Sequence, residues 1–322
     1  MKLATFCTEA NPAARVGLVT SACDALIDVA AAFVSAGRDP SGVRSMQDVI
    51  EGGEALLSEI VAHCGASGVE TIPLASLRLL APLPRPVQMR DCMCFEEHLV
   101  GSAKAAMQRA GLTELPERSR QMHEIFKKRP IYYKANRFAV VGPETDIYWP
   151  PYSSVMDYEL EMGCIIGKGG RDIARADARS HIFGFTIFND LSARDTQAFE
   201  MQSGLGPSKS KDFDSANILG PWIVTADEFY PDDAAMIVRV NGDVRSEGNS
   251  GSMTYKFEDL IAFISASETL HAGEVLGSGT VGGGCGLEAG KLLEDGDIVE
   301  LEIKGIGVLR NRVFASSKGE KK

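Results

Sequence analysis

The segment from Asp157 to Gly167 constrains the fold of this chain more than any other part of its sequence. Apolar side chains occupy every second position in it, and two acids and a glycine stand between them, which is the alternation of a β-strand. Glu159 and Glu161 therefore share one face of the strand, where their like charges repel. The opposite face is expected to be buried, because it consists of Tyr158, Leu160, Met162, Cys164 and Ile166.

Two like charges beside a buried strand face need compensation, and a hard divalent cation with oxygen ligands supplies it. A second apolar run, from Ile182 to Asn189, predicts another strand, and Asp190 follows at its end. Three carboxylates from two strands predict a site for Mg²⁺, Mn²⁺ or Ca²⁺ rather than Zn²⁺, since hard cations prefer ligands that are all oxygen. The alternative, that Glu159 and Glu161 line a solvated strand face, stays open here, because glutamate is usually exposed.

Two longer stretches of the sequence resemble a known protein family. Asp157-Tyr-Glu-Leu-Glu161, followed by Asn189-Asp-Leu-Ser-Ala-Arg-Asp-Thr-Gln197, closely resembles the signature of the fumarylacetoacetate hydrolase family, and the resemblance covers residues 85 to 314. It implies a mainly β, α+β fold in which a mixed β-sandwich roll forms the catalytic domain. Helices and strands do not alternate regularly along the chain, which also disfavours a doubly wound sheet.

The resemblance assigns roles to residues outside the strands. Asp91 would be a fourth metal ligand, and His98, seven positions later, the general base. A histidine base needs a carboxylate that fixes its tautomer, but Gly101 stands where small family members carry that glutamate. The resemblance therefore points to Glu288, in a late glycine-rich loop, as the partner of His98, with Glu97 as the fallback. A structural role for His98 is the alternative.

Further residues are expected near the substrate. The resemblance implies that Lys211 neutralises a substrate carboxylate or a developing oxyanion, and that Gln197 and Tyr133 bind substrate. Without the resemblance, Lys211 would be read as a solvated lysine in a polar loop.

A glycine-rich loop follows Gly277, and its residue Thr280 is expected to donate its hydroxyl to a substrate carboxylate. The alternative is a flexible hairpin without a binding role. Arg194 and Asp195 are expected to form a buried pair that braces the site rather than to touch substrate.

Composition restricts the class of protein. The chain has 322 residues, of which 44% are hydrophobic, enough for one large domain and a smaller one. A net charge of −11 argues against nucleic acid or an anionic membrane as a partner, and neither a membrane span nor a signal peptide is expected. The seven cysteines form no C-x-x-C pair, which predicts buried thiols and a reduced, cytoplasmic setting.

Sequence pattern divides the chain into parts. In the N-terminal part we expect a strand over Arg15–Val19, a helix over Ala22–Ala36 and a helix over Ser45–His63. The expected parts are a small α+β domain (1–80), a proline-rich linker (81–86), a catalytic domain (87–315) with a helical insertion that forms a lid or dimer arm (101–129), and a disordered tail (316–322).

The leading functional hypothesis is metal-dependent hydrolysis of a carbon–carbon bond in a β-diketo acid, such as an acylpyruvate or a fumarylacetoacetate-like compound. His98 would activate water, and the metal would bind the enolisable dicarbonyl. The second hypothesis keeps the site but makes the enzyme a lyase, decarboxylase, isomerase or hydratase of 2-oxo acids. A non-catalytic metabolite-binding protein is the third. The resemblance also implies a homodimer.

Overall fold

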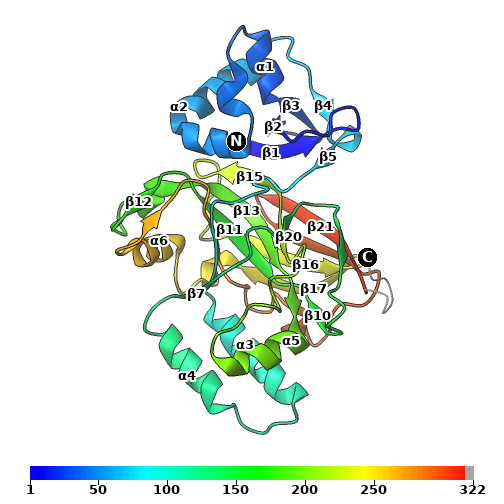
Figure 1. The fold of residues 1–322 in the computed structure, drawn as a ribbon, viewed down its shortest axis with the longest axis vertical. Coiled ribbons are helices and arrows are strands. Elements are labelled where there is room, and N and C mark those ends of the chain that lie inside the picture. Colours follow the sequence, from blue (N-terminus) through cyan, green and yellow to red (C-terminus); the bar gives the residue numbers. More distant parts are fainter. Residues whose placement is uncertain (316–322) are drawn as a thin grey trace.

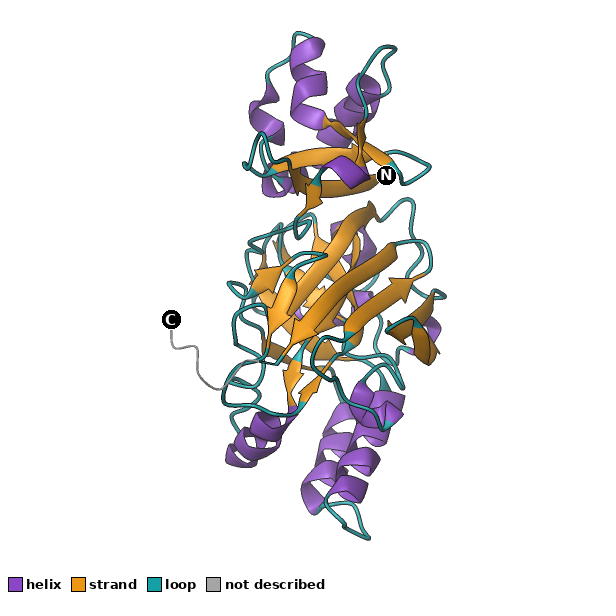
Figure 2. Cartoon of the chain, turned by 90° about the vertical axis from the view of Figure 1, so that its right-hand side faces the viewer, coloured by secondary structure: helices purple, strands orange, loops and turns teal. Residues whose placement is uncertain are grey.

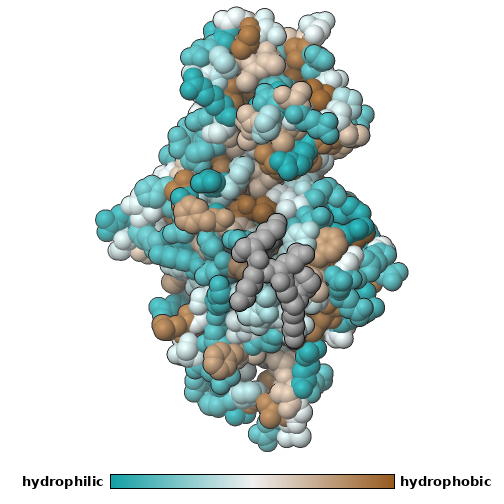
Figure 3. Space-filling view, turned by 45° about the vertical axis from the view of Figure 1, so that its right-hand side comes forward, coloured by the Kyte–Doolittle hydropathy of each residue, from teal (hydrophilic) through white to brown (hydrophobic). Residues whose placement is uncertain are grey.

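The computed structural model describes residues 1–315, and the tail expected to be disordered, 316–322, lies outside the described residues. A small N-terminal lobe stands on a larger β-rich body, and a helical hairpin projects from the opposite end of that body (Figures 1 and 2). Polar side chains cover most of the face drawn in Figure 3, where hydrophobic ones form separate patches. None of the helices within 1–315 has the length and apolar character that crossing a membrane requires.

The N-terminal lobe packs two helices against short antiparallel strands. The expected strand at Arg15–Val19 is confirmed. The helix expected at 45–63 is confirmed in position, with the Ser45 side chain accepting a hydrogen bond from the backbone N–H of Asp48 at its start, but it is broken at Gly53, whose φ of 59° is not helical. The elements are β1 (Lys2–Cys7), β2 (Arg15–Val19), β3 (Ala25–Asp28), α1 (Val29–Ser35), α2 (Met46–Cys64), β4 (Ile72–Pro73) and β5 (Arg78–Leu79).

The helix expected over 22–36 is wrong in its first half, because Ala25–Asp28 form strand β3 there. Cys23 has a φ of 57°, which lies outside the helical region. The Asp28 side chain then accepts a hydrogen bond from the backbone N–H of Ala31 and caps the helix, so that α1 begins only at Val29.

A twelve-stranded sheet runs through both lobes. The N-terminal strands join it where β1 pairs with β15, through Lys2 opposite Val224 and Leu3 opposite Ile223. The division into domains at 81–86 stays a prediction. Beyond β1 the sheet continues in the order β15 (Asn217–Thr225), β13 (Ile182–Asp190), β11 (Leu160–Ile166), β19 (Val275–Gly277), β6 (Met89–Met93) and β7 (Ile131–Lys134), with β8 (Val140–Val141) beside β15.

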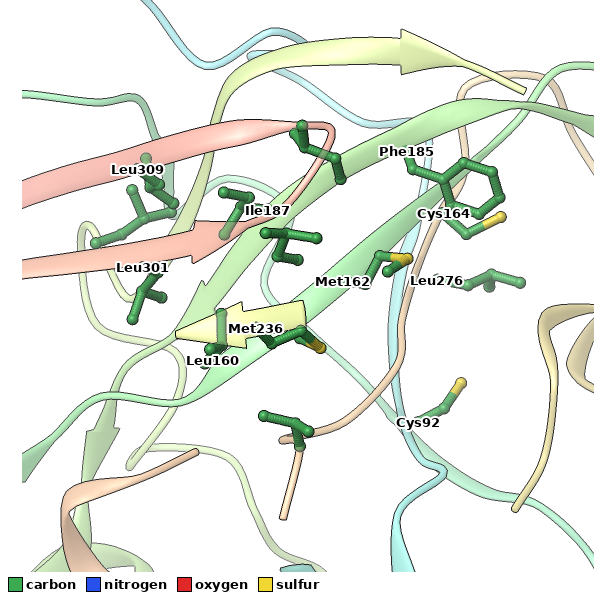
Figure 4. Close-up of a cluster of buried hydrophobic side chains, with 14 of the residues drawn as sticks. Cys92, Leu160, Met162, Cys164, Phe185, Ile187, Met236, Leu276, Leu301 and Leu309 are labelled. Carbon is green, nitrogen blue, oxygen red and sulfur yellow. The ribbon is translucent and has the colours of Figure 1, made fainter. Parts of the chain in front are cut away.

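A second, five-stranded sheet packs on one face of β11 and β13. Leu160 and Ile187 lie on that face, close to Met236, Leu301 and Leu309 of the second sheet (Figure 4). The expected mixed β-sandwich is thus confirmed. The second sheet has the order β17 (Asp243–Asn249), β16 (Ala235–Val240), β20 (Ile298–Ile303), β21 (Gly307–Phe314) and β9 (Asp146–Tyr148).

The central strands β11 and β13 are buried along their whole length. Because side chains alternate along a strand, Glu161 points away from the face that meets the second sheet. Glu161 is only 1% exposed and Glu159 only 5%, so the alternative of a solvated strand face is wrong. The buried acids are therefore a feature that the structure must compensate.

The expected helical insertion is a hairpin of α3 (Glu96–Arg109) and α4 (Glu117–Phe126). Nε2 of His123 on α4 lies 2.6 Å from Oε1 of Glu96 on α3, and this contact joins the two helices. The remaining elements are β10 (Met156–Asp157), β12 (Gly170–Arg171), β14 (Ser192–Ala193), α5 (Arg194–Glu200), α6 (Phe257–Ser265), β18 (Thr269–Leu270) and α7 (Gly286–Ala289).

Candidate active site

Three strands of the large sheet bring three acids together. Asp91 lies on β6, Glu161 on β11 and Asp190 at the end of β13, and their ligand atoms all lie within 4.8 Å of one another. Strand β19 separates β6 from β11, and Gly277 faces Asp91 across the ladder. A Cβ at Gly277 would lie 2.5 Å from Oδ1 of Asp91 and 2.9 Å from Oε2 of Glu161, so only glycine leaves room for both carboxylates.

Burial makes the charged forms of these acids costly. It raises the pKa of Asp91 to about 8, and the nearby Asp190 carboxylate acts in the same direction. Burial also raises the pKa of Asp190 to about 6, although Lys211 opposes this. The pKa of Glu161 lies well above its ordinary range because of burial and the adjacent Asp91.

The acid cluster Asp91–Glu161–Asp190 has free acceptor capacity. Oδ1 of Asp91 and Oδ1 of Asp190 are buried and have no hydrogen-bond partner among the described residues. The carboxylate of Glu161 accepts a hydrogen bond from the backbone N–H of Gly279 at 3.1 Å. Two unpartnered buried carboxylate oxygens beside a third carboxylate are a donor set for a hard divalent cation, so the residues present fit such a metal.

Glu159 lies beside the cluster but is held by cations. Nζ of Lys211 contacts the carboxylates of both Glu159 and Asp190, and Nη2 of Arg194 lies 2.8 Å from Oε1 of Glu159. Burial opposes the charge on Glu159, but Arg194 and Lys211 outweigh it and lower its pKa. Lys211 is only 2% exposed, so reading it as a solvated loop residue is wrong.

The expected pairing of Arg194 with Asp195 is wrong. Nε of Arg194 donates to Oδ2 of Asp157 at 2.8 Å, whereas Asp195 accepts from Ser153 at 2.6 Å. Both residues lie in the first turn of α5, where consecutive side chains point in different directions.

His98 and Glu288 form a close pair beside Glu159. Nδ1 of His98, in the first turn of α3, lies 2.6 Å from Oε2 of Glu288 on α7. Its other nitrogen, Nε2, lies 3.7 Å from Oε1 of Glu159. The fallback partner Glu97 is exposed and packs against Gly282 instead.

The Glu288 carboxylate is fixed from several sides. It accepts a hydrogen bond from the backbone N–H of Gly283 at 3.2 Å and one from the thiol of Cys285 at 3.3 Å. Asp157 holds the start of α7, since it accepts hydrogen bonds from the backbone N–H groups of Gly286 and Leu287 at 2.7 and 3.1 Å. The sequence pattern did not predict this role of Asp157, although an acid that directly precedes a buried strand is a signal for one.

Gly101 provides the space that Glu288 occupies. An added Cβ at Gly101, one turn after His98 on α3, would lie 2.3 Å from Oε1 of Glu288. The missing side chain at this position therefore lets the carboxylate approach from α7.

The remaining expected site residues line the same cavity of about 760 Å³ as Asp91, Glu159 and Glu161. The hydroxyl of Tyr133 donates to Oδ2 of Asp190 at 2.6 Å, and Oε1 of Gln197 accepts from Nη1 of Arg194 at 2.9 Å. Thr280 is buried, and its hydroxyl lies 3.4 Å from Oε1 of Glu161.

Buried carboxylates that converge from strand ends, beside a histidine–glutamate pair in a β-sandwich, place the chain among enzymes with an acidic metal site. Comparison with known proteins identifies the family. The chain belongs to the fumarylacetoacetate hydrolase family, because residues 93–314 match the family model described as "Fumarylacetoacetate (FAA) hydrolase C-terminal".

Relatives in this family carry several activities in their names. The human protein "Oxaloacetate tautomerase FAHD2A, mitochondrial" is 33% identical over 277 residues, which are 85% of this chain and 81% of the relative. The fumarylacetoacetate hydrolase of Exiguobacterium antarcticum is 27% identical with a TM-score of 0.73, over 98% of this chain and 100% of that one. The maleylpyruvate hydrolase of Sphingobium sp. SYK-6, with manganese(II) and pyruvate, is 25% identical with a TM-score of 0.73 over the same shares.

We expect the metal-free protein to lose stability as the pH rises. The pKa values of Asp91 and Asp190, about 8 and about 6, exceed the ordinary 3.8, so the folded state keeps protons that the unfolded state has lost. This contribution is complete below about pH 4 and disappears as the pH rises through 6 and 8. A bound cation replaces those protons, so Mg²⁺ or Mn²⁺ should raise Tm more at about pH 8 than at about pH 6.

Thermal unfolding in EDTA and in excess Mg²⁺ at both pH values measures this effect. Asp91→Asn should flatten the pH dependence of the metal-free protein, because the carboxyl group with a pKa of about 8 is gone. A metal-induced Tm gain that is equal at both pH values would contradict the prediction.

We also expect the effect of Gly101→Ala on the free energy of unfolding to depend on which residue stands at position 288. In the wild type the added methyl meets Glu288, and such overpacking costs about 1–3 kcal/mol. In a Glu288→Ala background the space is empty, and alanine in a helix then stabilises by up to about 1 kcal/mol over glycine. Urea unfolding of the four proteins measures the coupling. Equal effects in both backgrounds would rule out the steric role of Gly101.

Proposed function

We propose that this enzyme acts on small 2-oxo acids and transfers a proton at the carbon next to the oxo group, as in keto–enol tautomerisation. The observation that carries this proposal is the geometry of His98. Glu288 holds its Nδ1 at 2.6 Å, and its Nε2 faces the acid cluster, 3.7 Å from Glu159. The names of the relatives that are 33% identical, oxaloacetate tautomerases, support the same reaction.

An imidazole tied to a carboxylate through one nitrogen is suited to act as a general base with the other. Glu288 keeps the proton on Nδ1 of His98 and stabilises the imidazolium that forms. Nε2 takes the proton from the carbon between the two carbonyl groups, the electron pair moves to the carbonyl oxygen, and the imidazolium then gives its Nε2 proton to that oxygen, which restores the neutral base. The reverse sequence converts the enol to the keto form.

The other residues of the site would bind and polarise the substrate. Asp91, Glu161 and Asp190, with Glu159 as the fourth ligand, would hold a divalent cation. When bound, Mg²⁺ or Mn²⁺ supplies Lewis acidity toward the oxygens of the oxo acid. Lys211 offers a buried positive charge for a substrate carboxylate or an oxyanion, and we propose that Tyr133, Gln197 and Thr280 line the substrate.

Carbon–carbon bond hydrolysis of a β-diketo acid is the second candidate. The cavity of about 760 Å³ favours it, because a four-carbon oxo acid needs less space. The hydrolase names of two relatives of known structure agree with it. In this reaction His98 takes a proton from water, the water oxygen attacks the far carbonyl carbon, the carbon–carbon bond breaks, and the departing enolate is protonated.

Two further expectations stay predictions. The homodimer was expected from the family resemblance. The cytoplasmic setting was expected from the cysteines, whereas several relatives have names that include the word mitochondrial.

Loss of His98 should remove the activity and spare the metal site. His98→Ala should slow oxaloacetate tautomerisation at least about 100-fold, the usual scale for a general base. Glu288→Gln should slow it by a smaller factor, because the amide still orients the ring without stabilising the imidazolium. Decay of the enol absorbance measures the rate, and Mn²⁺ binding should be unchanged in His98→Ala.

His123→Ala is the matched control, because His123 also pairs with a glutamate at 2.6 Å but does not line the cavity. It should keep nearly the whole wild-type rate.

Pyruvate release from acetylpyruvate, measured in parallel, separates the two candidate functions. Release that is faster than tautomerisation would favour the hydrolase, and a His98→Ala variant within a few-fold of the wild type would contradict both.

A further inference from the structure

The cavity of the acid cluster continues along one face of α3 into the helical hairpin. Leu99, Ala103, Ala106 and Ala110 all line it, at positions i, i+4, i+7 and i+11, which fall on one side of a helix. This apolar stripe begins beside His98. At 1.5 Å per residue it runs for roughly 16 Å away from the acids.

Apolar side chains from other segments line the cavity as well. They are Met122 of α4, Ala198 of α5 and Met201. Methionine side chains are flexible and polarisable, so such a lining can adapt to ligands of different shapes. We call this extension the hairpin groove: Leu99, Ala103, Ala106, Ala110, Met122 and Met201.

The volume exceeds what the reacting part of a substrate fills. A cavity of about 760 Å³ is of the size that binds ligands with many more atoms than a four-carbon acid has. Asp91, Glu161, Lys211 and His98 line only part of it. With a four-carbon acid bound there, water would fill the groove against apolar side chains, and an apolar group that displaces this water gains affinity.

We propose that the hairpin groove binds an extended apolar arm, an acyl or aryl chain, attached to a 2-oxo acid head. The inference rests on the proposed function, because that function puts the 2-oxo acid head at the acid cluster. The head directs the arm past His98 and along α3. Arg109 and Arg118, both exposed, stand at the hairpin end of the groove and limit its apolar part.

Binding of linear 2-oxo acids tests the groove separately from turnover. Isothermal titration of the Mn²⁺-loaded protein with pyruvate, 2-oxobutanoate, 2-oxohexanoate and 2-oxooctanoate gives affinity against chain length. Each added methylene group should raise the affinity by about three-fold, the scale of apolar burial, until the groove is filled. Turnover of oxaloacetate is measured on the same preparation.

Ala106→Phe places a ring in the middle of the groove. The ratio of 2-oxooctanoate affinity to pyruvate affinity should fall at least about ten-fold in this variant. Gln108→Phe is the matched control, because Gln108 is exposed on the same helix and does not line the cavity, and there the ratio should keep its wild-type value.

An affinity that does not depend on chain length, or an equal ratio in wild type and Ala106→Phe, would overturn the groove assignment. Chain-length dependence without any turnover of oxaloacetate would leave the groove in place and overturn the proposed function instead. The two failures are therefore distinguishable.

Discussion

The site depends on one constraint: the carboxylates that are buried on β6, β11 and β13 must be neutralised. Protein cations meet this need only in part. Lys211 and Arg194 both contact Glu159, but within residues 1–315 no ion pair joins Asp91 or Glu161 to a basic side chain. The remaining need is met by protons, which these acids retain because burial raises their pKa values, or by a hard cation. The same groups thus account both for the pH-dependent stability that we expect without metal and for the chemistry of the site.

Small residues allow the acids and the base to come together. Gly277 leaves space between Asp91 and Glu161, and Gly101 leaves space for the Glu288 carboxylate beside His98. Asp157 links the two halves, because it binds Arg194 on one side and the start of α7 on the other. The base and the acid cluster are therefore positioned by one connected set of contacts.

Sequence pattern predicted the parts of this site that depend on strand alternation. The strand that carries Glu161 and the place of Asp190 at a strand end followed from local periodicity, whereas the burial of Glu161 itself did not. The partners of Arg194 and the burial of Lys211 did not, because both depend on contacts between segments far apart in the chain. Strand β3 was missed for a related reason, since its residues are also good helix formers and only pairing with β2 makes them a strand.

The most direct test of this account is a titration of the metal-free protein with Mn²⁺ in which electron paramagnetic resonance measures the bound metal. The account predicts one tightly bound Mn²⁺ per chain and loss of that binding in Glu161→Gln, which removes a carboxylate of the acid cluster. A wild-type protein that binds no Mn²⁺, or a Glu161→Gln variant that binds it as tightly as the wild type, would contradict the claim that these buried acids are a metal site.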